Sequence, residues 1–479
     1  MTVPIYTETY SSLPAGPVAN KDFLGWALII FSSVLLGIWA VRETIALRIG
    51  LLGVGTILSL VYCVRFFKNN PPRIPPKKWI PFILLGLMLC WVVVHYLFFS
   101  RFPDIQLHEL ISTWLRSGLA AILALGTGLA LSKRPTAINC LWVGILASFA
   151  HLFYQYIPKA IASNSLFAID YGYYIYSLKI NGVLMGTILV VGLLGTIVDT
   201  IRRAKRQEVL LVGLLGLSST IAVLYSFVFI FDTRNGVGLA VIMFAIVLLM
   251  VIGRVLCLLF LIRGGQGALT LLALMICIAG VVGWLGGEHV KHNPGWSTMW
   301  EDTKTSIQVE KYPNWQNIAV MGFPQNATGE VVKGNTYERL AWAIAGAQIF
   351  LPENPLGLGL LKQSFPKLVK EKYPNSGEIL GSHSAWVDIA LAFGYPGLTL
   401  LLGALLATAY LSIYSRSPFR SLGSLLSVGL LLLYTVGELN SQHSIEILYF
   451  LTSLISALLL LPQDLDVGDQ SPAARQDEV

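Results

Sequence analysis

Residues 209–231 read VLLVGLLGLSSTIAVLYSFVFIF, and after the short polar turn DTRNG at 232–236 a second apolar run follows at 237–258. The first run contains no charged residue. Because an α-helix needs about 20 apolar residues to cross the hydrocarbon core of a bilayer, the two runs predict a pair of membrane-spanning helices joined by a tight turn. Helices are expected because lipid offers no partner for a backbone N–H or C=O.

The same pattern recurs along the whole chain. The sequence is 55% hydrophobic and 12% charged, whereas an ordinary soluble domain is about 25% charged. We therefore predict an all-α, polytopic integral membrane protein with about twelve transmembrane helices. The predicted spans are 23–41, 46–66, 79–100, 113–131, 136–157, 180–200, 209–231, 237–258, 267–286, 384–411, 421–438 and 445–461.

Lysine and arginine in the short loops predict the orientation of these spans. If the N-terminus is cytoplasmic, the cytoplasmic loops hold fifteen of these residues and the short outer loops hold seven. Positive residues favour the cytoplasmic side, so both termini are expected there. In a bacterium the opposite side of the inner membrane is the periplasm.

One long polar segment interrupts the spans, at residues 287–382. It contains four tryptophans and equal numbers of acidic and basic residues, so we expect a folded helical cap on the periplasmic side rather than a linker. Predicted helices cover 296–310, 336–350 and 360–373. Asn335 is expected to cap the second helix, and the Glu338 side chain to accept the backbone N–H of Asn335 in return.

The predicted organisation follows from these boundaries. It comprises a cytoplasmic segment 1–22, spans one to nine within 23–286, the cap at 287–382, spans ten to twelve within 383–461, and a disordered cytoplasmic tail at 462–479. The tail is polar and acidic, a composition typical of disorder.

Two residues of the cap region are candidates for catalysis. His383 opens the tenth span, where an imidazole could accept a proton from a hydroxyl nucleophile; a hydrogen-bonded boundary histidine is the alternative. Arg339 shares a predicted helix face with Trp342, and its planar fork of donors suits phosphate; a solvated charge is the alternative.

Further cations map to the outer side and could bind an anionic substrate. Arg234 lies in the turn at 232–236, where Asp232 could simply pair with it. Arg101, Arg116 and Lys179 could complete a basic rim with Arg234 and Arg339, although any one alone could be an interfacial side chain. Trp342 would contact the substrate beside Arg339.

The sequence predicts neither a metal site nor a cofactor. His289 and His292 are three residues apart without an obvious third ligand, and no glycine-rich phosphate loop is present. All five cysteines fall within predicted spans, so the cap has no cysteine-based zinc site.

Three motifs give the chain a resemblance to a known family. They are TRNG at 233–236, RLAW at 339–342 followed by PENPLGLG at 352–359, and SHSAW at 382–386 followed by GYPGL at 394–398. With this order and layout, residues 80–460 resemble the O-antigen ligase / O-antigen polymerase superfamily of bacterial envelope glycosyltransferases. The chain departs from the family at Ser384, where asparagine is common, and at Ala392, where an acidic residue is common.

The resemblance implies glycan transfer in the periplasm without nucleotide sugars. Its closest form is the O-antigen ligase, which joins a polysaccharide from undecaprenyl diphosphate to a sugar hydroxyl of lipid A–core. His383 and Arg339 would be catalytic, and Arg234, Arg116, Lys179, Arg101 and Trp342 would bind the diphosphate or glycan. An O-antigen polymerase and a protein O-oligosaccharyltransferase remain alternatives, and so does a twelve-span transporter from an unrelated class.

Overall fold

The computed structural model describes residues 22–69, 74–168, 174–203, 206–261, 266–438 and 441–461. The predicted disordered tail at 462–479 lies outside these residues, as does the predicted N-terminal segment apart from Asp22. Within them the chain is helical, and its β-pairing is limited to two isolated bridges, Val41–Tyr176 and Gln325–Val331.

A helix lies at each of the twelve predicted positions. In chain order these helices are α1 (Phe23–Ile38), α2 (Ile45–Asn69), α3 (Ile80–Phe98), α5 (Leu115–Ser132), α6 (Ile138–Ser163), α7 (Lys179–Arg203), α8 (Arg206–Tyr225), α9 (Arg234–Leu261), α10 (Gln266–His292), α16 (Ala385–Tyr414), α17 (Arg420–Val436) and α18 (Gln442–Leu458). A short helix, α4 (Pro103–Glu109), and the π-helical segment η3 (Leu110–Trp114) lead directly into α5.

Length and composition support the membrane class. Among the described residues, eight helical segments are long and apolar enough to cross a bilayer, while α1 and α17 are shorter apolar helices. Large apolar side chains point outward, as with Val64 at 66% and Leu249 at 69% exposure. The prediction of an all-α polytopic membrane protein is confirmed at this level.

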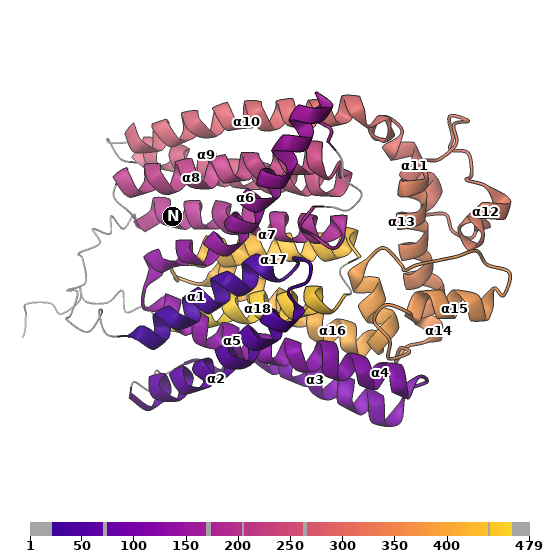
Figure 1. Ribbon diagram of the computed structural model, residues 1–479, viewed down its shortest axis with the longest axis horizontal. Coiled ribbons are helices and arrows are strands. Elements are labelled where there is room, and N and C mark those ends of the chain that lie inside the picture. Colours follow the sequence, from indigo (N-terminus) through magenta and orange to yellow (C-terminus); the bar gives the residue numbers. More distant parts are fainter. Residues whose placement is uncertain are drawn as a thin grey trace, which may run out of the picture.

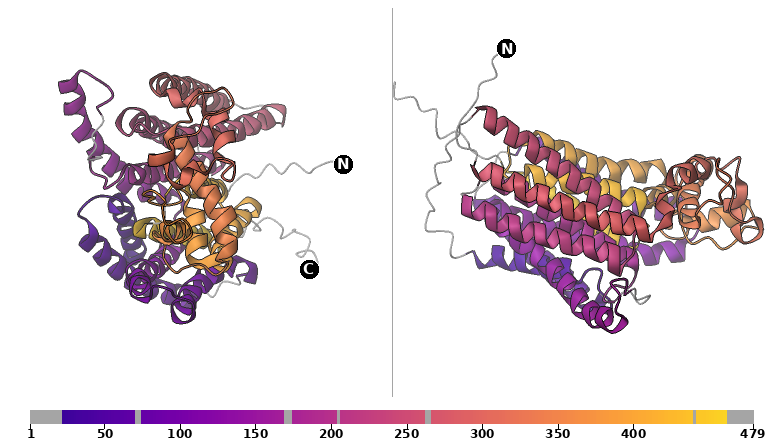
Figure 2. Two further views of the ribbon diagram at one scale, coloured as in Figure 1. Left: turned by 90° about the vertical axis from the view of Figure 1, so that its right-hand side faces the viewer. Right: turned by 90° about the horizontal axis from the view of Figure 1, so that it is seen from above.

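The long helices run side by side, and the cap occupies one end of the bundle (Figure 1; Figure 2, right). The central helix is α7, of which 94% of the apolar window is buried, against 33% for α2. Helices α5 and α18 pack closely, because a Cβ at Gly128 would lie only 2.4 Å from Cβ of Ala457.

The cap is built from short helices around its own core. These are α11 (Met299–Ser306), α12 (Ile318–Met321), α13 (Gly334–Ala345), α14 (Leu351–Glu353) and α15 (Ser364–Lys372). They enclose Trp315, Tyr337, Phe350 and Phe365, each almost fully buried. Seen end-on, the cap lies in front of the bundle (Figure 2, left).

Three local predictions for the cap differ from the structure. The helix predicted at 296–310 is shorter, since α11 ends at Ser306, and α10 extends six residues beyond its predicted end. The predicted capping box is wrong, because α13 begins at Gly334 with Lys333 as its N-cap residue. Asn335 therefore lies inside the helix, where it accepts a hydrogen bond from Arg339.

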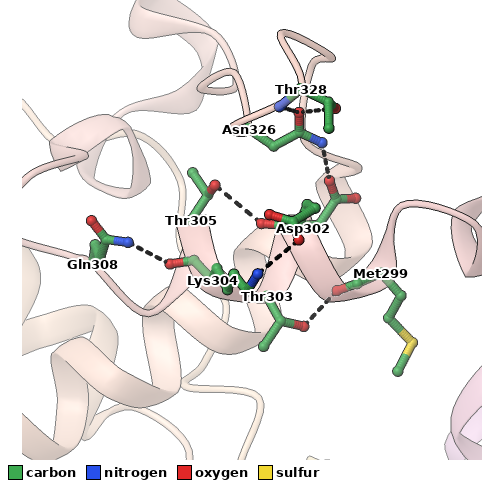
Figure 3. A network of polar contacts seen from close by, with 9 residues as sticks. Met299, Asp302, Thr303, Lys304, Thr305, Gln308, Asn326 and Thr328 are labelled. Atoms are coloured by element: carbon green, nitrogen blue, oxygen red, sulfur yellow. Dashed lines mark hydrogen bonds and ion pairs between the residues drawn. The ribbon is translucent and has the colours of Figure 1, made fainter.

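A buried carboxylate replaces that capping box. Asp302 of α11 is fully buried and accepts hydrogen bonds from the Asn326 side chain at 3.0 Å and the Thr298 hydroxyl at 2.9 Å. It also accepts the backbone N–H of Lys333 at 3.2 Å. Figure 3 shows Asn326 reaching toward Asp302 from the neighbouring loop. Asp302 thereby fixes the start of α13, the helix that presents Arg339.

Candidate active site

His383 lies in a tightly held loop between the cap and α16. The Ser382 N–H donates to Asp388 of α16 at 3.2 Å, and the Ser382 hydroxyl donates to the Ser384 carbonyl at 3.0 Å. The backbone of His383 is left-handed, with φ of +59°. A non-glycine residue rarely adopts this conformation, and surrounding contacts must stabilise it.

The ring of His383 has an aromatic side chain against one face and a carboxylate beside its edge. It stacks on the indole of Trp342, with ring centroids 5.0 Å apart and planes within 6° of parallel. The His383 Nδ1 atom faces the Oε1 atom of Glu438. Nδ1 is buried and forms no hydrogen bond with the described residues. A proton on Nδ1 would face the Glu438 carboxylate and would leave Nε2 for a substrate.

The protonation of His383 responds to opposing influences. Burial, followed by the positive charge of Arg339, lowers the pKa of His383 below its usual range. A carboxylate beside an imidazole in general favours the charged ring, so Glu438 would stabilise an imidazolium formed when Nε2 accepts a proton. The resting ring is thus neutral, as a general base must be.

Arg339 presents an unsatisfied donor at the same place. Its Nε donates to Asn335 at a long 3.4 Å, while its buried Nη1 has no hydrogen-bond partner among the described residues. Burial lowers the pKa of Arg339, although a guanidinium remains charged in proteins. Buried donors are normally satisfied, so Nη1 is available to an anionic ligand.

Arg234 reaches the same helix from the bundle side. Its Nη1 donates to the Gly295 carbonyl at 3.1 Å and to the Thr336 hydroxyl at 3.3 Å. Thr336 is three residues before Arg339 on α13, so both arginines lie near one helix face. Gly295 permits this approach, because a Cβ there would lie 2.6 Å from Arg234 Nη1.

Lys179 is held beside the arginines by a partly buried chain of polar contacts. Its ammonium donates to the backbone carbonyl of Asp232, whereas the Asp232 carboxylate contacts His289 Nε2 at 3.2 Å. His289 is fully buried, and its Nδ1 accepts the indole N–H of Trp296 at 3.1 Å. The charge of Lys179 is close enough to interact with those of Arg339 and Arg234.

Two hydrogen bonds draw the separate loops together around the end of α17. The Ala385 N–H donates to the Gly437 carbonyl at 2.9 Å, and the Asn235 side chain donates to the Val436 carbonyl at 2.8 Å. The His383 loop and the Arg234 turn are thus both held at the end of α17, next to Glu438. A base and three cations therefore meet at the junction of bundle and cap.

The remaining predicted cations lie elsewhere. Arg101 forms an exposed ion pair with Glu371 at 2.8 Å, beside an open surface pocket of about 390 Å³. Arg116 lies on α5 near Arg48 and Glu446. The structure therefore brings Arg339, Arg234, Lys179, Trp342 and His383 together and separates Arg101 and Arg116 from them.

Glu438 and His289 are the site residues that sequence reasoning missed. Glu438 is a lone carboxylate at the end of a predicted span, and that position was its only signal. His289 does not pair with His292, which stacks on Phe167 with centroids 3.7 Å apart. Among the described residues, no three His, Cys, Asp or Glu side chains gather as a metal site would require.

Comparison with known proteins adds no assignment. No protein-family model matches the chain, and no curated protein matches its sequence. The class that the structure defines is a polytopic, all-helical membrane protein with a helical cap over one end of its bundle.

Proposed function

We propose that this protein is a glycosyltransferase of the bacterial inner membrane, with its active site facing the periplasm. It would transfer O-antigen polysaccharide from undecaprenyl diphosphate to a sugar hydroxyl of lipid A–core, as a step of lipopolysaccharide biosynthesis. The observation that supports this best is the pairing of a neutral, carboxylate-backed His383 with the unsatisfied guanidinium of Arg339. The bundle of long apolar helices with a cap at one end also supports the proposal.

The proposed reaction is a direct displacement at the anomeric carbon. His383 Nε2 accepts the proton of the acceptor hydroxyl, whose oxygen forms the new bond to the anomeric carbon. The bond from that carbon to the phosphate oxygen breaks, and undecaprenyl diphosphate leaves with the electron pair. A single displacement inverts the anomeric centre. Glu438 stabilises the imidazolium that results.

Cationic side chains would hold the leaving diphosphate without a metal ion. Arg339 Nη1 is the free donor, and Arg234 and Lys179 add positive charge nearby. Donors aimed at developing negative charge are a large source of catalysis. Trp342 keeps the His383 ring in place by stacking and closes one side of the site.

Reconstitution tests this function. Purified protein is supplied with undecaprenyl-diphosphate-linked polysaccharide and lipid A–core, without ATP or added metal, and the joined product is measured on gels. We expect transfer by the wild type and a loss of about 10²–10⁴-fold in His383→Ala. The transfer rate of Arg339→Ala should fall by at least about 10²-fold, the loss expected when one donor to the transition state is removed.

Matched controls are available on surfaces remote from the site. His151→Ala removes an exposed histidine of α6, and Arg416→Ala removes an exposed arginine at the opposite end of the bundle. Both should transfer like the wild type. Near-normal transfer by His383→Ala and Arg339→Ala at normal protein levels would sink the proposal.

A gene deletion separates ligase from polymerase, which would share the donor. Loss of a ligase leaves lipid A–core without any O-antigen while lipid-linked polymer persists. Loss of a polymerase leaves single repeats attached to core. Transfer to protein serines or threonines would appear instead as loss of glycoprotein with intact lipopolysaccharide.

A further inference from the structure

A second group of cationic side chains lies in the bundle near the loop that follows α1. Arg48 of α2 donates from Nη1 to the Trp39 carbonyl at 2.5 Å. The indole N–H of Trp39 donates to Glu446 of α18 at 2.7 Å. Arg48 and Glu446 are therefore linked through a single tryptophan, although almost 400 residues separate them in sequence.

Arg116 lies close to this group because η3 and the start of α5 run beside the start of α18. The Gln442 side chain donates to the Ser112 carbonyl, so position 112 lies opposite position 442. Arg116 and Glu446 are each four residues further along, about one helical turn. The two helices run in parallel at this level, and Arg116 consequently lies near Glu446.

The guanidinium groups of Arg48 and Arg116 keep donors that the described residues do not use. Arg48 Nε is buried without a hydrogen-bond partner among the described residues. Arg116 forms no hydrogen bond or ion pair with any residue that the structure describes. The single carboxylate, Glu446, is 3% exposed and accepts from Trp39 rather than from either arginine. A half-buried guanidinium with unused donors is costly, and a bound anion would offset that cost.

The surroundings indicate that such an anion would belong to a lipid. The neighbours of Arg48 along α2 are apolar and exposed, with Ile45 at 55%, Leu47 at 54% and Ile49 at 43%. A helix surface of this kind faces hydrocarbon. The guanidinium fork suits the oxygens of a phosphate group, and an acyl chain could lie along the exposed apolar side chains.

We propose that Arg48 and Arg116 bind the phosphate group of a lipid-borne ligand, at a site separate from the Arg339 group. Because it rests on the proposed function, the expected ligand is the phosphorylated glycolipid acceptor, while Arg339, Arg234 and Lys179 hold the donor diphosphate. Two phosphate sites would allow both lipid substrates to be bound at once.

Native mass spectrometry of the full-length protein tests this without requiring transfer. The probes are a phosphorylated disaccharide lipid of the lipid A type, the same lipid after dephosphorylation, and phosphatidylglycerol. We expect the wild type to retain the phosphorylated glycolipid, and Arg48→Gln and Arg116→Gln each to lower its affinity about tenfold, as loss of one charged hydrogen bond implies. Retention of undecaprenyl diphosphate should stay unchanged in both.

Glu446→Gln should change lipid retention in the opposite direction to the two arginine variants. Removing the carboxylate keeps an acceptor for Trp39 but takes away negative charge, so phosphate retention should stay equal or rise. If Arg48, Arg116 and Glu446 were only a structural network, Glu446→Gln would lose stability and no variant would change lipid retention selectively. Lys291→Gln, an exposed change on α10, is the charge control.

The lipid probes identify the source of the phosphate. A loss confined to the phosphorylated glycolipid supports an acceptor site, and an equal loss of phosphatidylglycerol supports a general headgroup site. Unchanged retention of every probe in Arg48→Gln and Arg116→Gln would overturn the inference. Absent transfer with these binding differences intact would contradict the proposed function alone.

Discussion

At the residue scale, the site depends on what surrounds one imidazole. His383 alone is a weak base at a membrane boundary, since burial and Arg339 both disfavour its protonated form. In the proposed mechanism Glu438 would change this balance, because its carboxylate faces Nδ1 and would stabilise the imidazolium. Trp342 restricts the ring from the other side. We propose that the three residues act as one functional unit.

Replacing Glu438 tests that unit. With Glu438→Gln the imidazolium is less stabilised, so we expect transfer to fall by about 10²–10⁴-fold. The pKa of His383 should drop further, moving the acid limb of the pH–rate profile to lower pH. Initial rates measured across a pH series check both effects. Glu310→Gln, an exposed cap carboxylate, should match the wild type; an unshifted acid limb in Glu438→Gln would argue against the unit.

At the scale of elements, the position of α13 decides where Arg339 lies. The helix has no side chain capping its first turn, and its start is held by Asp302 of α11 through Lys333. Its middle is held by Tyr337, whose hydroxyl donates to the Tyr312 carbonyl at 2.7 Å. Arg234 attaches to the same helix through Thr336. Contacts from three elements therefore set the geometry of one arginine.

Asp302→Ala should loosen this arrangement. One buried and two partly buried donors lose their acceptor, which costs on the order of 3 kcal/mol, and the segment leading to α13 should open. We expect a lower unfolding temperature, faster limited proteolysis of the cap, and a raised KM for the lipid-linked donor. Glu330→Ala, an exposed change on the same loop, is the control. If the cap of Asp302→Ala were cleaved at the wild-type rate, other contacts would hold the cap.

At the scale of the whole molecule, the bundle brings loops from distant parts of the chain to one end. The end of α17 binds both the Arg234 turn and the start of α16. The cap then covers that junction (Figure 1). Helix α7 is buried in the centre of the bundle. Its first residue, Lys179, lies among these loops because it donates to the Asp232 carbonyl. The site is a product of helix packing rather than of any one segment.

The orientation of the molecule gives a direct test. Single cysteines are introduced into a cysteine-free background at Lys311 of the cap and at Arg420, at the other end of the bundle. In spheroplasts, a membrane-impermeant maleimide should label Lys311→Cys immediately and Arg420→Cys only after permeabilisation. The reverse pattern would place the candidate active site on the cytoplasmic side and remove the basis for a periplasmic reaction.

The sequence by itself determined the class of fold and much of the list of candidate residues. An uncharged run as long as 209–231 must form a helix in lipid, because its backbone polar groups have to be hydrogen-bonded within the segment. This requirement does not depend on how the neighbouring helices pack. Local chemistry likewise singled out His383, Arg339 and Arg234. The weaker local signals, such as the cap on α13, were overridden by a buried carboxylate from another helix.

Only the tertiary structure decided which of these residues work together. Two arginines that the sequence placed in one basic rim, Arg101 and Arg116, lie outside the His383 group. Glu438, which the sequence did not single out, lies against His383. The physical reason is that a hydrophobic span encodes its own length but not which helix it packs beside. Neighbour relations arise from close contacts such as Gly128 with Ala457, which no local pattern reveals.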